Sequence, residues 1–148
     1  YQSIVKADYG ILTLPDNSGI VEVVAGDLEG VKGPANTYSP VNMYNVKLKK
    51  NASYNFDLPA DWNTALLVIE GNIKLNESRD INQDSFVLFE NGEDSISIQA
   101  KDDSTILVLS GEPIDEPIAA YGPFVMNTNE ELELAYQEYN AGKYGRLE

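Results

Sequence analysis

The sequence predicts an all-β domain, either a sandwich or a barrel, followed by one C-terminal helix. About nine short runs rich in Val, Ile, Leu, Tyr and Phe recur at intervals of roughly 8–12 residues. Gly, Pro, Asn and Asp separate these runs, and several runs alternate apolar with polar side chains. A chain of 148 residues is long enough for one such domain to enclose a core.

Residues 1–40 predict N-terminal strands and a linker. Ile11–Leu14 and Ile20–Ala25 are rich in β-branched residues, and both runs end at turn residues. The stretch 26–40 contains three Gly and two Pro, a composition that predicts a long loop.

Residues 41–110 predict the core of the barrel. The segment from Tyr54 to Leu58 alternates apolar with polar residues, which is typical of a half-buried strand. The run Ala65–Ile69 is continuously apolar and predicts a strand that is buried on both faces. The remaining predicted strands of this core lie around Val41–Leu48, Ile73–Leu75, Phe86–Phe89, Ile96–Ile98 and Thr105–Leu109.

The C-terminal part changes character. The stretch 111–127 contains several Pro and Gly residues, which predict irregular structure. Thr128, with Glu131 three residues later, forms the pattern of a capping box, and apolar residues then recur at helical spacing. We therefore expect a helix over 129–141, ended by Gly142, because glycine readily adopts the left-handed conformation of a C-terminal cap.

The composition excludes several classes of function. Ten Lys and Arg residues face 24 Asp and Glu residues, so the net charge of −14 disfavours direct binding to nucleic acid or to an anionic membrane. The chain has no Cys and no His, which removes disulfides, thiolate nucleophiles and the commonest metal ligand. No apolar run reaches the roughly 18 residues that a membrane-spanning helix needs.

The two ends of the sequence suggest a fragment of a longer cytoplasmic protein. The chain begins at Tyr1 without an initiator Met, and nothing at this end resembles a secretory signal. The final Leu147-Glu148 is typical of an expression-vector remnant and is left out of the fold prediction. We therefore expect residues 1–146 to form a single domain.

A distinctive string of residues follows the last predicted strand and continues into the helix. It reads GEPIDEPI from Gly111 and YGPFVMNT from Tyr121, and it closes with AGKYG from Ala141. This string resembles the C-terminal signature of the pirins, a family of the cupin superfamily. The residues that carry the resemblance are Gly111, Glu112, Pro113, Glu116, Pro117, Tyr121, Gly122, Pro123, Phe124, Met126, Asn127, Thr128 and Gly142.

The resemblance implies a double-stranded β-helix, which is the cupin or jelly-roll barrel, followed by a C-terminal α-helix. It also implies a partner, because full-length pirins carry an N-terminal cupin domain that holds iron through His and Glu ligands. Quercetin 2,3-dioxygenase activity and roles in transcriptional co-regulation are associated with the family. The segment 111–146 is then the signature loop and the helix of a C-terminal cupin domain.

The resemblance also locates the positions at which a cupin carries its metal ligands. Counted back from Gly71, and with the second motif added, these positions fall at Asp57, Pro59, Asn63 or Thr64, and Ser95. A single carboxylate among them is too few donors for a transition-metal site. We therefore expect this chain to bind no metal and no other cofactor, and we expect it not to be an enzyme on its own.

Three hypotheses about function remain open. The chain is a metal-free cupin module that packs against the absent iron-binding domain, or it belongs to a dioxygenase whose active site lies in that absent half, or it is a small barrel that binds an organic molecule. In the last case the residues expected to line the pocket are Tyr44, Tyr54, Trp62 and Asn63. The surface left by an absent partner also favours a homodimer.

Overall fold

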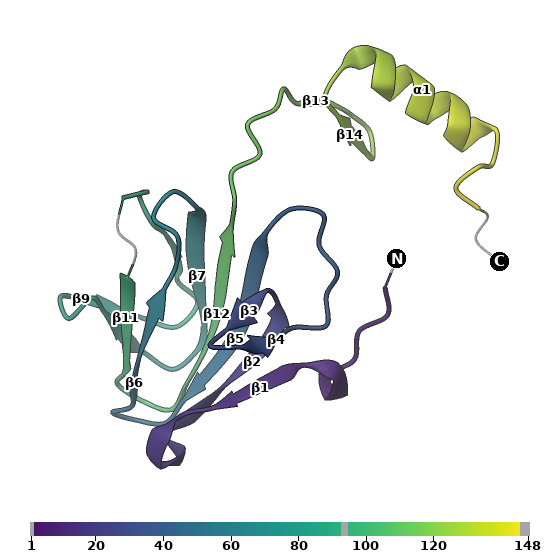
Figure 1. Ribbon diagram of the computed structural model, residues 1–148. Coiled ribbons are helices and arrows are strands. Elements are labelled where there is room, and N and C mark those ends of the chain that lie inside the picture. The colour runs from purple at the N-terminus through teal and green to yellow at the C-terminus, as the bar shows by residue number, and fades with distance from the viewer. Residues whose placement is uncertain (1, 93–94, 146–148) are drawn as a thin grey trace. The chain divides into compact units, whose positions relative to one another are not determined.

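The computed structural model describes residues 2–92 and 95–145, and it confirms the predicted all-β fold with one C-terminal helix (Figure 1). The chain divides into two compact units, one up to Pro113 and one from Ile114 onward, within the stretch 1–146 that the sequence analysis treats as one domain. The predicted remnant Leu147-Glu148 lies outside the described residues. Among the described residues, no helix has the length and apolar character that crossing a membrane requires.

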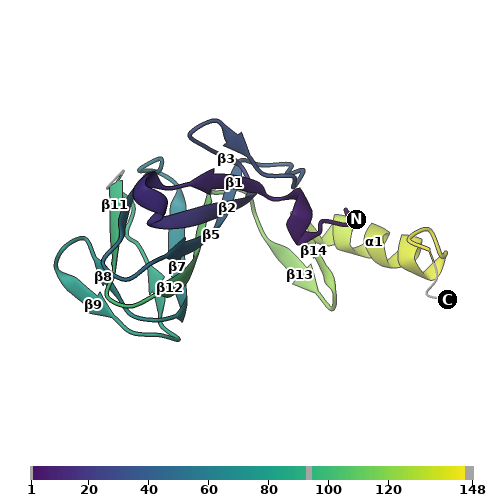
Figure 2. The same cartoon turned by 90° about the horizontal axis from the view of Figure 1, so that it is seen from below.

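The first unit is built from two antiparallel sheets (Figure 2). In order across the sheet, the six-stranded sheet contains β1 (Gly10–Thr13), β2 (Gly19–Ala25), β5 (Val41–Leu48), β12 (Ser104–Gly111), β7 (Asn63–Glu70) and β10 (Phe86–Leu88). The four-stranded sheet contains β6 (Ser53–Asp57), β11 (Ser95–Ala100), β8 (Ile73–Leu75) and β9 (Arg79–Ile81). Two single-turn helices, η1 (Lys6–Asp8) and η2 (Pro15–Asn17), precede β1 and β2.

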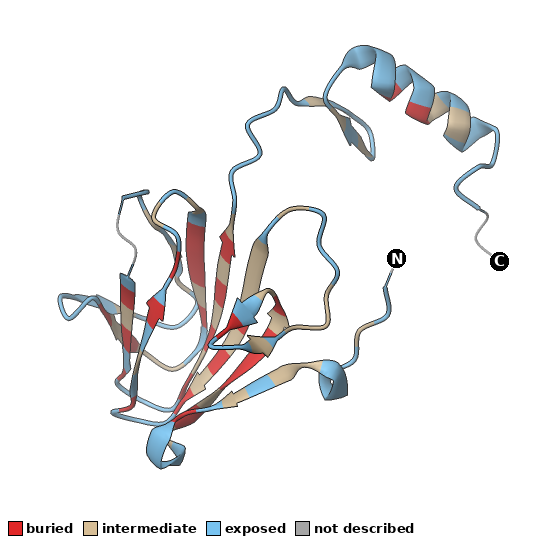
Figure 3. Ribbon diagram, in the orientation of Figure 1, coloured by how far each residue is buried: buried red, intermediate tan, exposed pale blue. Residues whose placement is uncertain are grey.

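The core lies between these two sheets, where the buried positions of their strands face each other (Figure 3). Strand β12 alternates strictly, with Ile106 and Val108 buried in the core and Leu107 and Leu109 on its outer side. From the other sheet, Phe56 is fully buried and stacks on Tyr44 with 5.8 Å between the ring centroids. The alternation follows from the two-residue period of a strand.

Strand β7 departs from the sequence prediction in one respect. The run Ala65–Ile69 was expected to be buried on both faces, but Ile69 is 44% exposed and Leu67 is only partly buried. Leu66 and Val68 alternate with them and belong to the core. Along the outward row of β7, Ala65 is therefore buried, Leu67 is partly buried and Ile69 is exposed.

A β-hairpin interrupts the predicted loop 26–40. Strands β3 (Asp27–Leu28) and β4 (Val31–Lys32) pair across Glu29 and Gly30, whose φ angles are 51° and 84°. Two consecutive positive φ angles are typical of a type I′ turn, and the Asp27 side chain accepts a hydrogen bond from Gly30 N at 2.8 Å. The prediction of a plain loop was wrong because it counted Gly and Pro without considering this turn chemistry.

The second unit also contains a hairpin where irregular structure was predicted. Strands β13 (Ala119–Tyr121) and β14 (Phe124–Met126) pair across Gly122-Pro123, and Gly122 has a φ angle of 58°. Glycine at the first turn position suits a type II′ turn, and the fixed φ of proline suits the second position. The proline therefore helps to build this hairpin instead of preventing it.

Helix α1 (Asn129–Asn140) follows directly, and its predicted capping box is confirmed. Glu131 N donates to Thr128 Oγ1 at 3.2 Å, and the Glu131 carboxylate accepts from Thr128 N at 3.1 Å. Leu132 and Ala135 are the buried residues of the helix. Gly142, just beyond the C-cap, has a φ angle of 75°, as the sequence predicted for the helix end.

A buried carboxylate on β2 connects three segments of the first unit. Glu22 is 2% exposed, and it accepts hydrogen bonds from Lys47 Nζ at 2.7 Å and from the Asn45 carboxamide, while Lys6 Nζ lies 3.5 Å away. Burial raises the pKa of Glu22, but the hydrogen bonds from Lys47 and Asn45 and the positive charges of Lys47 and Lys6 outweigh it and hold this pKa below its usual value. Glu22 therefore stabilises the fold as an anion.

We predict that Glu22→Gln lowers the free energy of unfolding at neutral pH by about 1–3 kcal/mol, because a charged hydrogen-bond acceptor is lost from a buried position. The contribution of Glu22 is complete above its unfolded pKa and is lost as the pH falls through the lower folded pKa. Urea titrations from pH 7 to pH 3 should therefore show a difference between the two proteins that shrinks with acid. Glu112→Gln, at an exposed position, is the matched control; equal effects from both substitutions would contradict the prediction.

Candidate functional site

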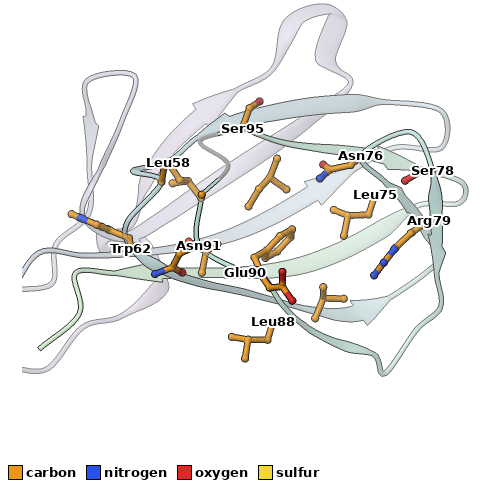
Figure 4. A pocket seen from close by; sticks show the side chains of 16 residues that line it. Leu58, Trp62, Leu75, Asn76, Ser78, Arg79, Leu88, Glu90, Asn91 and Ser95 are labelled. Carbon is orange, nitrogen blue, oxygen red and sulfur yellow. The ribbon is translucent and has the colours of Figure 1, made fainter. Parts of the chain in front are cut away.

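A cavity of about 480 Å³ opens between the two sheets of the first unit (Figure 4). Its apolar wall includes Leu58, Leu75, Val87, Phe89 and Ile96. Trp62 and Asn91 lie at one end of the view, and Ser78 and Arg79 lie at the other. The cavity therefore has an apolar interior and polar groups at both ends.

Of the four residues expected to line a pocket, only Trp62 lines this cavity. Tyr44 lies in the core, where its hydroxyl donates to Asp27 O at 2.9 Å, and burial, with the Asp27 charge, raises the pKa of Tyr44 to about 12. Asn63 is exposed at the start of β7. The predicted group therefore does not form one site.

Tyr54, the fourth of these residues, holds the β3–β4 hairpin. Its hydroxyl donates to Glu29 Oε1 at 2.7 Å, and Glu29 lies in the turn of that hairpin. Burial, followed by the hydrogen bond to Glu29, raises the pKa of Tyr54 well above its usual value, so the hydroxyl keeps its proton. Tyr54 thus has a structural contact to a loop.

The structure divides the predicted metal-ligand positions. Thr64 and Ser95 line the cavity, whereas Asp57, Pro59 and Asn63 do not. Asp57 and Pro59 are exposed, whereas their neighbours Phe56 and Leu58 are buried in the core, as the alternation of side chains along a strand requires.

The side chains that do face the cavity from this region offer few donors for a metal ion. Leu58 and Ala60 are apolar, and Ser95 contributes a hydroxyl. Thr64 is buried at the cavity, and its Oγ1 lies 2.9 Å from Ser110 Oγ in a buried hydrogen bond. Within residues 2–92 and 95–145, no three His, Cys, Asp or Glu side chains are grouped so that they could hold a metal ion. The lining therefore does not fit iron.

The signature string does not line the cavity; its residues lie at the end of β12 and within the second unit. Gly111 is the last residue of β12, and Glu112 N donates to Pro40 O at 3.1 Å. In the second unit, the Glu116 carboxylate accepts a hydrogen bond from the Asn127 carboxamide. Phe124 packs edge-on against Tyr136 of α1, with 5.0 Å between the ring centroids. These contacts give the signature residues a structural role.

Comparison with known proteins identifies the family. The model of the Pirin C-terminal cupin domain matches residues 43–145. The chain belongs to the pirin family. Human pirin is 30% identical to it over 137 residues, which cover 88% of this chain and 47% of human pirin.

Other pirin relatives carry enzyme names. A Pseudomonas aeruginosa protein, provisionally named a quercetin 2,3-dioxygenase, is 35% identical over 146 residues, 99% of this chain and 51% of that protein. A crystal structure of quercetin 2,3-dioxygenase from Acinetobacter baumannii matches the whole chain and 51% of its own chain, with a TM-score of 0.87 and 33% identity. This pirin chain thus spans about half the length of these relatives. The prediction that the chain alone is not an enzyme is contradicted, because proteins with these names match its whole length and point to an enzyme function.

The sequence analysis missed Asn76 and Arg79, which also line the cavity. Asn76 follows β8 and Arg79 begins β9, and β9 was not predicted as a strand. Asn76 and Glu77 both have positive φ angles, 46° and 56°. Asparagine in a short polar stretch after Ile73–Leu75 is a turn signal that could have located this hairpin.

We predict that Thr64→Val destabilises the protein by about 1–3 kcal/mol, because the buried Ser110 hydroxyl loses its partner. The double variant Thr64→Val/Ser110→Ala removes both hydroxyls and should recover most of that loss. Chemical denaturation of the wild type, both single variants and the double variant measures the coupling between the two residues. Additive effects of the two substitutions would show that the hydrogen bond contributes nothing.

Proposed function

We propose that this chain is the C-terminal cupin domain of a quercetin 2,3-dioxygenase-type pirin, and that it takes part in that function by packing against an iron-binding cupin domain. The observation that carries this proposal is an uncovered apolar surface on the six-stranded sheet. The names of the relatives support the enzyme class, and their length, about twice that of this chain, supports a partner domain.

The surface is formed by the outward rows of three neighbouring strands. Its two rows follow from the strand registers: Phe86 pairs with Leu67 and Leu67 with Leu107, while Leu88 pairs with Ala65 and Ala65 with Leu109. Phe86 is 63% exposed and Leu88 is 71% exposed, whereas the row behind them is partly buried at Leu67, Leu107 and Leu109 and buried at Ala65. We call these six residues, together with Ile69, the outer apolar face.

The outer apolar face has the character of an interface. Contiguous exposed apolar residues on a folded domain mark sites of protein association. Each large apolar side chain that becomes fully buried contributes about 1.5–3 kcal/mol, so covering Phe86 and Leu88 alone is worth several kcal/mol. A cupin domain of the same polypeptide is the occupant that the doubled length of the relatives supports.

The proposal assigns the iron to the partner domain. The chain has no His and no Cys, and the cavity wall before and at the start of β7 holds Leu58, Ala60 and Thr64. We predict that the chain, purified after growth with added iron, holds far less than one metal ion per molecule by inductively coupled plasma mass spectrometry. A stoichiometric metal that survives size-exclusion chromatography would contradict this assignment.

To test docking, this chain is mixed with the half of the Pseudomonas aeruginosa relative that it does not match, produced separately. Size-exclusion chromatography with light scattering should show a one-to-one complex, and Leu88→Lys should weaken it at least tenfold, because a charge would be buried in an apolar contact. Tyr38→Lys is the matched control, since Tyr38 is fully exposed in the loop before β5 and is not part of the outer apolar face.

Without a partner domain, the same face is expected to join two copies of this chain. A complex that is unchanged by Leu88→Lys, or two components that elute separately, would contradict docking through this face. Quercetin turnover by the mixture, compared with each component alone, then tests the enzyme class.

A further inference from the structure

We propose that the cavity between the two sheets is a binding site for a small, uncharged aromatic molecule that carries hydroxyl groups. The cavity shares Leu88 with the outer apolar face but otherwise lies between the two sheets, and the inference does not depend on docking. It follows from the size of the cavity, from the apolar side chains and carboxamides that line it, and from the charges of its lining residues.

The cavity has the size and composition of a small-molecule site. Its volume of about 480 Å³ lies within the range of roughly 300–1,000 Å³ that is typical of ligand pockets. Leu58 and Ala60 form part of its apolar wall, and Phe89 and Ile96 extend the same wall. A surface without metal donors but with apolar side chains selects an organic ligand by the hydrophobic effect.

Trp62 gives the cavity a preference for flat ligands. Its indole lies at one end of the cavity, beside Asn91 (Figure 4). Aromatic rings favour offset-stacked or edge-to-face contacts with other rings, which are worth more than the apolar area alone. An aromatic ligand therefore gains more from this wall than an aliphatic ligand of the same size.

Two carboxamides are fixed at the cavity by their own hydrogen bonds. Asn76 Oδ1 accepts from Ser97 N at 2.9 Å, and Asn91 Nδ2 donates to Asp61 O at 3.2 Å. Each bond uses one end of its carboxamide and orients the other end, a donor on Asn76 and an acceptor on Asn91. A hydroxyl group can both accept and donate, so it matches either carboxamide.

The charges favour a neutral ligand. Among the described lining residues, Arg79 is the one cation and Glu90 the one anion, so together they contribute no net charge. The chain as a whole carries a net charge of −14, which repels an anionic ligand as it approaches. A phenol therefore fits the site better than the corresponding carboxylate.

The chain contains a single Trp, so its indole N–H gives one signal in a ¹⁵N-correlated NMR spectrum and reports directly on the cavity. The probes are 2-naphthol and 2-naphthoate, which share a ring system and differ in charge at neutral pH. We expect 2-naphthol to shift the Trp62 signal saturably, and to bind at least tenfold more tightly than 2-naphthoate.

Filling the cavity provides the second test. Ala60→Phe should weaken 2-naphthol binding at least tenfold, whereas Ala7→Phe, the same change at an exposed position of η1, should leave binding unchanged. If Ala60→Phe does not fold, Ser95→Leu at the exposed rim of the cavity replaces it.

Three outcomes would overturn the inference. The first is a Trp62 signal that does not respond to 2-naphthol. The second is binding that both the cavity-filling and the control variants leave unchanged. The third is tighter binding of 2-naphthoate that disappears in Arg79→Ala, which would assign the cavity to anions.

Discussion

Strand β12 determines the rest of the first unit, because it pairs along its full length with β5 on one side and with β7 on the other. The two-residue period of these strands sends Ile106 and Val108 into the core and Leu107 and Leu109 to the opposite face. This sheet's contribution to the core and the outer apolar face on its other side are therefore consequences of one register. Thr64 and Ser110 lie on the inward row of the same strand pair, next to the cavity.

The sequence was sufficient for the parts of the fold that depend on local periodicity. The alternation around Phe56 and the capping box of Thr128 and Glu131 both predicted structure correctly, because backbone geometry alone decides them. The hairpins at Glu29-Gly30 and Gly122-Pro123 were missed, since a composition rich in Gly and Pro was taken as loop. Their turn types are local as well, so closer attention to residues that favour positive φ angles, such as Gly30 and Gly122, would have found them.

The candidate site was harder to predict, because it depends on contacts between distant segments. The residues predicted to line one pocket, Tyr44, Tyr54, Trp62 and Asn63, lie at different places in the structure. The cavity joins Trp62 to Arg79 through pairings that no local pattern encodes. Of the predicted metal-ligand positions, Thr64 and Ser95 line the cavity and Asp57 and Pro59 do not, because a count along one strand cannot tell the inner face from the outer face without a fixed register. The resemblance to the pirin family predicted the overall architecture but not which side of its sheet each side chain faces.

The outer apolar face extends to the edge strand of its sheet, and this edge limits how the domain can aggregate. Strand β10, which carries Phe86 and Leu88, is only three residues long and lies at one end of the six-stranded sheet. So short a strand presents few backbone donors and acceptors, and it is a poor template for the addition of further chains by main-chain pairing. Attraction between copies is therefore directed to the side chains of the outer apolar face, which saturate once they are matched. Such a geometry favours closed pairs over fibrils.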